Sequence, residues 1–196
     1  MYCVEWSIMA IIKPFPAIRP AKGLEHKIAA LPYDVYNKEE AKQVVQSNPY
    51  SFLKIDRAET QFEDSISIYD KCVYEKAHEL LWNMIAKNEF IQDKKPCYYI
   101  YQLTMNQRKQ TGIVACASID DYEKNIIKKH ENTREDKEID RINHVEACEA
   151  QTGPIFLAYR SNQIINEIIT KNQKNEPVYD FVSDDLISHT VWMITN

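Results

Sequence analysis

The chain has 196 residues, 44% of them hydrophobic and 27% charged, which are ordinary values for a globular protein with a sizeable core. A formal net charge of -5 argues against bulk nucleic-acid binding, and three glycines are too few for the glycine-rich phosphate loops of Walker and Rossmann proteins. Five dispersed cysteines without a C-x-x-C pair exclude a disulfide framework or a zinc knuckle, and reduced thiols suit a cytoplasmic protein.

The first third of the chain contains extended pieces and one short helix. Residues 1–8 lack the basic start and long apolar core of a signal peptide, and we interpret them as an extension that precedes the folded domain. Three prolines within residues 11–20 predict an extended piece at the edge of a sheet. Asn37 is the predicted N-cap of a helix that continues to Ser47 and is ended by Asn48 and Pro49.

The middle of the chain alternates between sequence patterns typical of strands and the spacing of about 3.6 residues that is typical of helices. Residues 51–56 are typical of a short strand. Residues 63–88 carry apolar side chains at a spacing of about 3.6, which predicts a long helix. Residues 97–105 and 110–119 are rich in tyrosine, isoleucine and valine and flank a polar tetrapeptide, which is the pattern of an antiparallel hairpin.

The last third continues the mixture. We expect a short helix over residues 120–127, a charged helix over 131–150, a buried strand over 154–159, a helix over 163–174, and strands over 178–182 and 189–194. No run reaches the roughly 18 apolar residues of a membrane span, so no membrane partner is expected. Because the elements show no regular βαβ rhythm, we predict one α+β domain with a mixed, largely antiparallel sheet and flanking helices.

Residues 128–154 carry the most conspicuous polar pattern. In a continuous helix, steps of four and three residues would place these side chains on one face: His130, Arg134, Lys137, Arg141, His144, Cys148 and Gln151. Like charges at this spacing cost about 0.2 to 0.5 kcal/mol per pair. A bound phosphate or carboxylate would offset that cost. Ion pairs from Arg134 to Glu131 and Glu138 on a solvated helix explain the pattern equally well.

Candidate acid–base groups lie around this pattern. His130 and His144 would be roughly 21 Å apart at ~1.5 Å per residue, too far to share a metal ion, but either is suited to general acid–base work. Thr152 and Gly153 either face the ligand of the helix or simply end it. Asp34 is a candidate base or metal ligand, although an aspartate near a proline is typical of turns.

Several strings between Met9 and the end of the chain form a recognisable set: Pro14-Phe15, Ile18-Arg19-Pro20, Pro32-Tyr33-Asp34-Val35, Asn48-Pro49-Tyr50-Ser51-Phe52-Leu53, Lys128-Lys129-His130-Glu131-Asn132-Thr133-Arg134, Asp136-Lys137-Glu138, Asp140-Arg141, His144 and Ala150-Gln151-Thr152-Gly153-Pro154. In these strings the chain resembles, from about Met9 to its end, the bacterial family called domain of unknown function 1015. The resemblance implies a distant ParB/sulfiredoxin-like fold. Because family members are about twice as long and carry an Asp-Gly-His-His-Arg string that this sequence lacks, it also implies that residues 9–196 are the N-terminal part of a truncated domain.

The same resemblance implies phosphoserine or serine as the ligand, and phosphoserine hydrolysis or a related phosphoryl transfer as the reaction. In that hypothesis His130 or His144 assists proton transfer, and Asp34 or Glu131 contributes as a catalytic carboxylate or holds Mg²⁺. The anion would be held by Lys129, Arg134, Lys137, Arg141, Gln151, Thr152 and Gly153. The alternative is a non-catalytic module that binds a small anionic metabolite, such as a nucleotide, or a partner protein.

Overall fold

The computed structural model describes residues 9–130 and 132–195. The predicted extension at residues 1–8 lies outside them. The helices are α1 (Glu25–Ile28), α2 (Lys38–Ser47), α3 (Leu53–Asp56), α4 (Lys71–Ala86), α5 (Ile119–Glu123), α6 (Glu135–Cys148) and α7 (Gln163–Asn172), with 3₁₀ turns η1 (Tyr33–Val35) and η2 (Ala58–Gln61). The strands are β1 (Ile12–Lys13), β2 (Ile18–Pro20), β3 (Phe90–Gln92), β4 (Tyr98–Met105), β5 (Arg108–Val114), β6 (Cys116–Ala117), β7 (Tyr179–Val182) and β8 (Ser188–Ile194).

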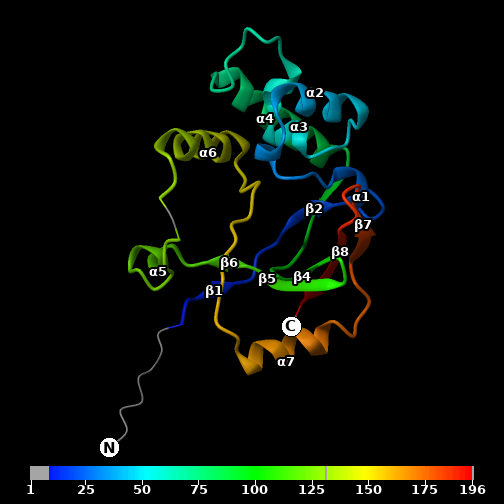
Figure 1. Cartoon of the computed structure of the whole chain (residues 1–196), viewed down its shortest axis with the longest axis vertical. Helices are drawn as coiled ribbons and strands as arrows, with labels where there is room; N and C mark the ends of the chain where they lie inside the picture. The colour runs from blue at the N-terminus through cyan, green and yellow to red at the C-terminus, as the bar shows by residue number, and fades with distance from the viewer. Residues whose placement is uncertain (1–8, 131, 196) are drawn as a thin grey trace, which may run out of the picture.

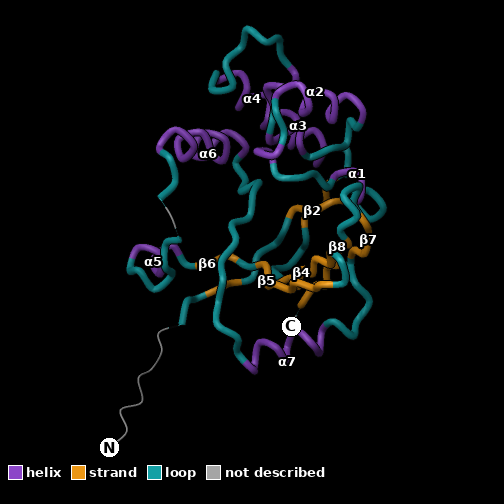
Figure 2. The backbone as a smooth tube through the Cα atoms, in the orientation of Figure 1, coloured by secondary structure: helices purple, strands orange, loops and turns teal. Residues whose placement is uncertain are grey.

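The main sheet has four strands in the order β5-β4-β8-β7. Two small two-stranded sheets, β1-β6 and β2-β3, accompany it, and every pair among the described strands is antiparallel. Figure 1 shows α2, α3 and α4 gathered at one end of the molecule, the main sheet below them and α7 on the far side of that sheet. The tube in Figure 2 shows the strands gathered below α2, α3 and α4, with α5 and α7 at the borders of the strand region. The predicted α+β class is confirmed.

The hairpin of β4 and β5 forms where the sequence predicted it. Its register places Ile100 opposite Ile113 on one side and opposite Trp192 of β8 on the other. The chain reverses through Asn106 and Gln107, whose φ angles are 49° and 67°. Two successive positive φ values match the right-handed twist of the flanking strands, and asparagine tolerates this conformation better than most residues.

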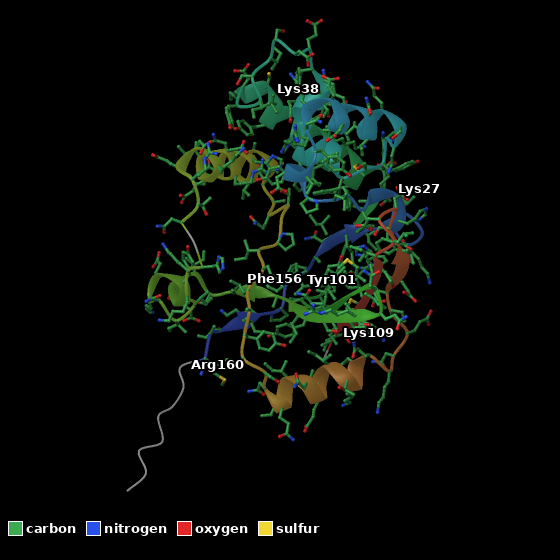
Figure 3. The ribbon with its side chains drawn as sticks, in the orientation of Figure 1. Lys27, Lys38, Tyr101, Lys109, Phe156 and Arg160 are labelled. Atoms are coloured by element: carbon green, nitrogen blue, oxygen red, sulfur yellow. The ribbon has the colours of Figure 1, made fainter. Side chains whose placement is uncertain are left out.

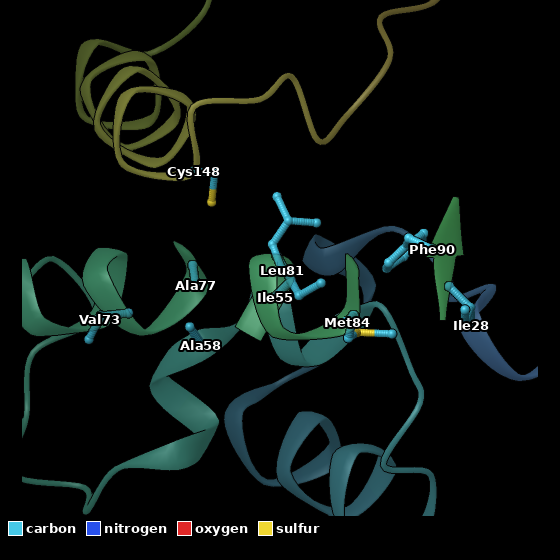
Figure 4. Packing of buried hydrophobic residues seen from close by; sticks show 9 residues of the cluster. All are labelled: Ile28, Ile55, Ala58, Val73, Ala77, Leu81, Met84, Phe90 and Cys148. Carbon is cyan, nitrogen blue, oxygen red and sulfur yellow. The ribbon is translucent and has the colours of Figure 1, made fainter. Parts of the chain in front are cut away.

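Apolar clusters hold these layers together, and one of them joins α2 to α3 through Ala41, Val45 and Leu53. One face of the sheet packs on α7 through Ile100, Trp192 and Ile169, all less than 10% exposed. The largest cluster joins the helices and is shown in Figure 4. It consists of Ile28, Ile55, Ala58, Val73, Ala77, Leu81, Met84, Phe90 and Cys148.

Helix α2 has the bounds that its capping residues predict. The side chain of Asn37 accepts a hydrogen bond from the backbone N–H of Glu40, and the Glu40 carboxylate accepts one from the backbone of Asn37. This reciprocal pair satisfies two N–H groups that a helix start leaves without partners.

Helix α4 is shorter than the predicted helix over residues 63–88. Residues before Lys71 form turns, because the Asp70 carboxylate accepts from the Ser67 N–H and the Ser67 hydroxyl accepts from the Tyr69 N–H. Such local side-chain bonds compete with helix formation. At the other end Asn88 adopts a φ of 56°, which ends the helix.

Two predicted strands are wrong. Residues 51–56 include helix α3, and the Ser51 hydroxyl just before this helix accepts a hydrogen bond from the N–H of its first residue, Leu53. Ser51, Leu53 and Ile55 are nevertheless buried in alternation, which explains the misleading pattern. Residues 154–159 form no strand, and Ile155 and Phe156 are 75% and 79% exposed.

Within the described residues, no helix has the length and apolar character needed to cross a bilayer.

Candidate functional site

Several segments that are distant in the sequence meet where α6 packs against α4. Asp140, His144 and Cys148 lie four residues apart on α6 and are all buried, which fixes the face of α6 that points inward. Figure 4 shows Cys148 directed from α6 toward α4. We call the polar group around this face the Asp56–Arg141 cluster. It consists of Tyr33, Asp56, Tyr74, Asp140, Arg141, His144 and Thr152.

Arg141 is the cation of the cluster. Its Nε and Nη2 atoms lie 3.2 and 2.9 Å from Oδ2 of Asp140. Its guanidinium carbon lies 4.5 Å from the centroid of the Tyr33 ring, a distance at which the charge is attracted to the ring face. The side chain is 32% exposed, so a solute can reach it.

Asp140 ties this arginine to α4. Its Oδ1 atom accepts a hydrogen bond of 3.0 Å from the Tyr74 hydroxyl, while its other oxygen binds Arg141. Burial and the neighbouring Asp140 charge raise the pKa of Tyr74, so the phenol remains a donor. The position of Arg141 is therefore set by two helices.

Asp56 and His144 form the buried part of the cluster, with Nε2 of His144 3.7 Å from Oδ1 of Asp56. Burial raises the pKa of Asp56 to about 6, although the Arg141 charge and the nearby Thr152 hydroxyl oppose this shift. Burial and the Arg141 charge lower the pKa of His144 to about 4. Near neutral pH the imidazole is uncharged, and the carboxyl group is the one that titrates.

Cys148 closes the base of the cluster. Its Sγ atom lies 3.7 Å from Nε2 of His144, and burial raises the pKa of the thiol to about 11. The thiol is thus protonated and a poor nucleophile. The carbonyl of Cys148 accepts from Nε1 of Trp82 at 3.1 Å, and that of Ala147 lies 2.8 Å from Nδ1 of His78, so α4 satisfies carbonyls at the end of α6.

The structure brings three of the predicted site residues together: Arg141, His144 and Thr152. The predicted helix over 131–150 begins only at Glu135 and ends at Cys148, so the proposed continuous face is interrupted at both ends. Lys137 lies on α6 and is half-buried.

The other predicted residues lie elsewhere. Arg134 is 77% exposed and binds Asp136, so the alternative of a solvated ion pair fits it, although with a different partner from those expected. Lys129 lies 4.9 Å from the centroid of the Tyr122 ring, and His130 is exposed in the loop before α6. Gln151 donates to the Gly153 carbonyl. Asp34 is exposed in η1, and Glu131 lies outside the described residues.

Asp56, Tyr33, Tyr74 and Asp140 were not among the predicted functional residues. Tyr33 and Asp140 could have been found from the sequence, because they belong to the strings that carry the family resemblance and adjoin Asp34 and Arg141. Asp56 had none, because it stood at the end of an apolar run interpreted as a strand.

The cluster is not the uniformly cationic face that the sequence suggested. It contains two carboxyl groups and one guanidinium, together with hydroxyl donors. Within residues 9–130 and 132–195, no group of three or more His, Cys, Asp or Glu side chains is arranged to hold a metal ion. The arrangement is suited to an anion at Arg141 and to proton transfer by Asp56, whose pKa of about 6 lies close to neutral pH.

Comparison with known proteins gives one match. The model of a family described as "Protein of unknown function (DUF1015)" matches residues 12–196. No curated protein and no solved structure matches the chain. The predicted likeness to ParB and sulfiredoxin and the predicted truncation stay predictions.

Proposed function

We propose, from the premise that the chain belongs to the Protein of unknown function (DUF1015) family, that it binds phosphoserine or serine at the Asp56–Arg141 cluster and supports phosphoryl chemistry such as phosphoserine hydrolysis. The observation that carries the proposal is the position of Asp56, a carboxyl group with a pKa of about 6, next to Arg141 and Thr152. Phosphoryl transfer depends above all on positioning and charge neutralisation.

Arg141 provides the anion contact in this proposal. A guanidinium binds a phosphate through two parallel N–H groups, and the stacked Tyr33 ring holds its plane. Asp140 occupies that fork in the structure, so the phosphate competes with it or binds the remaining N–H groups. The carboxylate of Asp140 suits the ammonium group of an amino acid, which a simple phosphate lacks.

Asp56 provides the proton in the hydrolysis. A water oxygen attacks phosphorus while the bond from phosphorus to the serine oxygen breaks. The protonated Asp56 carboxyl gives its proton to the departing serine oxygen, and the proton released by the attacking water restores it. Neutral His144 beside it adds no positive charge that would lower the pKa of Asp56.

The test is phosphate release from phosphoserine at pH 6 with added Mg²⁺. We expect Asp56→Asn to lose about 100-fold or more in rate. The matched control is Asp120→Asn, because Asp120 is 75% exposed and pairs with Lys124 on the surface, and its rate stays within about twofold of the parent.

A longer family member that carries the Asp-Gly-His-His-Arg string is assayed in parallel. Activity in the longer protein alone would support a divided site, and no release from either protein would contradict the hydrolytic proposal. Phosphoserine binding without turnover would instead favour the non-catalytic alternative.

A further inference from the structure

A separate groove of about 410 Å³ opens beside the C-terminal half of α4. It shares no residue with the Asp56–Arg141 cluster. The loop before α3, helix α3, helix α4 and the start of the turn to β3 contribute its walls. The lining residues are Pro49, Tyr50, Lys54, Leu80, Asn83, Met84, Lys87 and Glu89.

The groove carries more positive than negative charge. Lys54 and Lys87 face a single carboxylate, Glu89. A third cation stands at the rim, because Nζ of Lys27 lies 5.6 Å from the centroid of the Tyr50 ring. Figure 3 shows Lys27 on α1.

Lys54 is held in place at this groove. Its ammonium group donates to the Pro49 carbonyl, and the side chain is half-buried. Burial lowers the pKa of Lys54, and the charge of Lys87 lowers it further, whereas Glu89 acts in the opposite direction. A cation that has lost part of its hydration and faces a second cation is stabilised by an added anion.

Apart from Asn83, the remainder of the lining is apolar. Tyr50 offers an aromatic ring that is 36% exposed and Leu80 adds aliphatic surface from α4, whereas Met84 belongs to the buried cluster of Figure 4. Ligand sites typically combine such apolar walls with a few charged groups that fix orientation. Here the charged groups are lysines at one side of an apolar wall.

We propose that this groove binds a small phosphorylated compound with a planar ring, its phosphate held by Lys54 and Lys87 and its ring placed against Tyr50 and Leu80. This site is distinct from the proposed phosphoserine site, and neither proposal depends on the other.

Pyridoxal 5′-phosphate is a suitable probe, because its phosphate tests the lysine pair and its aldehyde reports the nearby amine. The uncharged lysine nitrogen adds to the aldehyde carbon, water leaves and an imine forms, which added borohydride reduces to a stable amine. Peptide mass spectrometry then gives the rate of labelling at each lysine. Lys71 is the internal reference, since it is 89% exposed at the start of α4, the helix that ends just before Lys87.

We expect Lys54 to be labelled at least about tenfold faster than Lys71, Lys87→Met to remove most of that excess, and inorganic phosphate to protect Lys54. Lys71→Met is the matched control for Lys87→Met and leaves labelling at Lys54 unchanged. Pyridoxal without phosphate should show a several-fold smaller preference for Lys54, because only the lowered pKa of Lys54 then favours it. Equal labelling of Lys54 and Lys71 by pyridoxal 5′-phosphate, or an undiminished preference with unphosphorylated pyridoxal or in Lys87→Met, would overturn the proposal.

Because labelling is read at Lys54 itself, the result is independent of phosphoserine hydrolysis. Asp56→Asn keeps the labelling pattern, so loss of the proposed activity and loss of groove binding are separated. Circular dichroism of each variant confirms that the fold is retained.

Discussion

Asp56 and His144 face each other at 3.7 Å, and burial moves their pKa values in opposite directions. The pKa of the carboxyl group is raised to about 6, and that of the imidazole is lowered to about 4. Burial disfavours the charged form of both groups. Each group therefore lowers the free energy of unfolding when it is charged. Asp56 does so at high pH and His144 at low pH.

Replacement of Asp56 by asparagine should stabilise the protein at alkaline pH. In the parent, the unfolded carboxyl loses its proton near pH 4 and the folded one near pH 6, so stability falls as the pH rises through this window. Asp56→Asn removes the loss, and its free energy of unfolding at pH 8 should exceed that of the parent by roughly 3 kcal/mol at most. Urea denaturation at pH 4 and pH 8 measures this. Asp120→Asn is the control, and the same difference at both pH values would contradict the prediction.

His144→Gln should flatten the acid side of the profile. The unfolded imidazole takes up a proton near pH 6.5, whereas the folded one does so only near pH 4, so the parent loses stability as the pH falls through this window. Glutamine cannot titrate, and we expect the difference in unfolding free energy between variant and parent to shift in favour of the variant by roughly 3 kcal/mol between pH 7.5 and pH 4. His26→Gln serves as the control, since His26 is exposed on α1. A parallel pair of pH profiles would show that His144 is not the cause.

Local rules predicted the elements that local interactions determine. Asn37 and Glu40 form the predicted helix start, and the polar Asn106-Gln107 pair turns the predicted hairpin. The two strands of the C-terminal hairpin, β7 and β8, also lie within one residue of their predicted bounds. In each of these elements the decisive hydrogen bonds join residues close together in the sequence.

The cluster could be predicted only in part, because its residues meet through tertiary packing. Asp56 lies 85 residues before Arg141 in the sequence, and the two are brought together by the docking of α6 on α4. Spacing along a single predicted helix could find Arg141 and His144 but not their partners on other elements. It also extended the helix over Arg134, which the structure places at the N-cap.

Thiol accessibility should distinguish Cys116 from Cys148. Cys116 is exposed on β6, whereas Cys148 is fully buried and burial raises its pKa to about 11. Iodoacetamide at pH 8 should modify Cys116 in the native protein and Cys148 only after unfolding, because the thiolate is the reacting species. Peptide mass spectrometry with and without urea measures both sites. Rapid native modification of Cys148 would be inconsistent with the packing of α6 on α4.

Near the C-terminal end of α6, glycine should stabilise the protein at position 149 and destabilise it at position 146. Glu149 has a φ of 53° in the left-handed region, where a side chain is unfavourable by about 1 kcal/mol or more. Glu149→Gly should therefore raise the free energy of unfolding, by up to about 1 kcal/mol after the added flexibility of the unfolded chain is subtracted. Glu146→Gly, three residues earlier inside the helix, should lower it by about 1 kcal/mol. Thermal denaturation of both variants decides the matter, and a loss in both would contradict the proposed helix end.

The ion pair of Arg19 with Asp93 should contribute far more to stability than a surface pair. Nε and Nη2 of Arg19 bind the carboxylate at 2.9 and 2.7 Å, Nη1 binds the Tyr179 hydroxyl at 2.8 Å, and the Tyr99 hydroxyl binds the same carboxylate. These contacts join the small β2-β3 sheet to strands β4 and β7 of the main sheet.

Arg19→Met leaves the Asp93 carboxylate, whose side chain is only 10% exposed, without its cation. We expect a loss of about 3 to 5 kcal/mol in the free energy of unfolding, because one member of a buried pair is then uncompensated. Lys71→Met, which breaks an exposed pair with Glu75, should cost less than about 0.5 kcal/mol. The double variant Arg19→Met with Asp93→Leu should recover part of the loss, since no buried charge remains. If Arg19→Met and Lys71→Met had the same effect in urea denaturation, the pair would not be what fastens the small sheet to the main one.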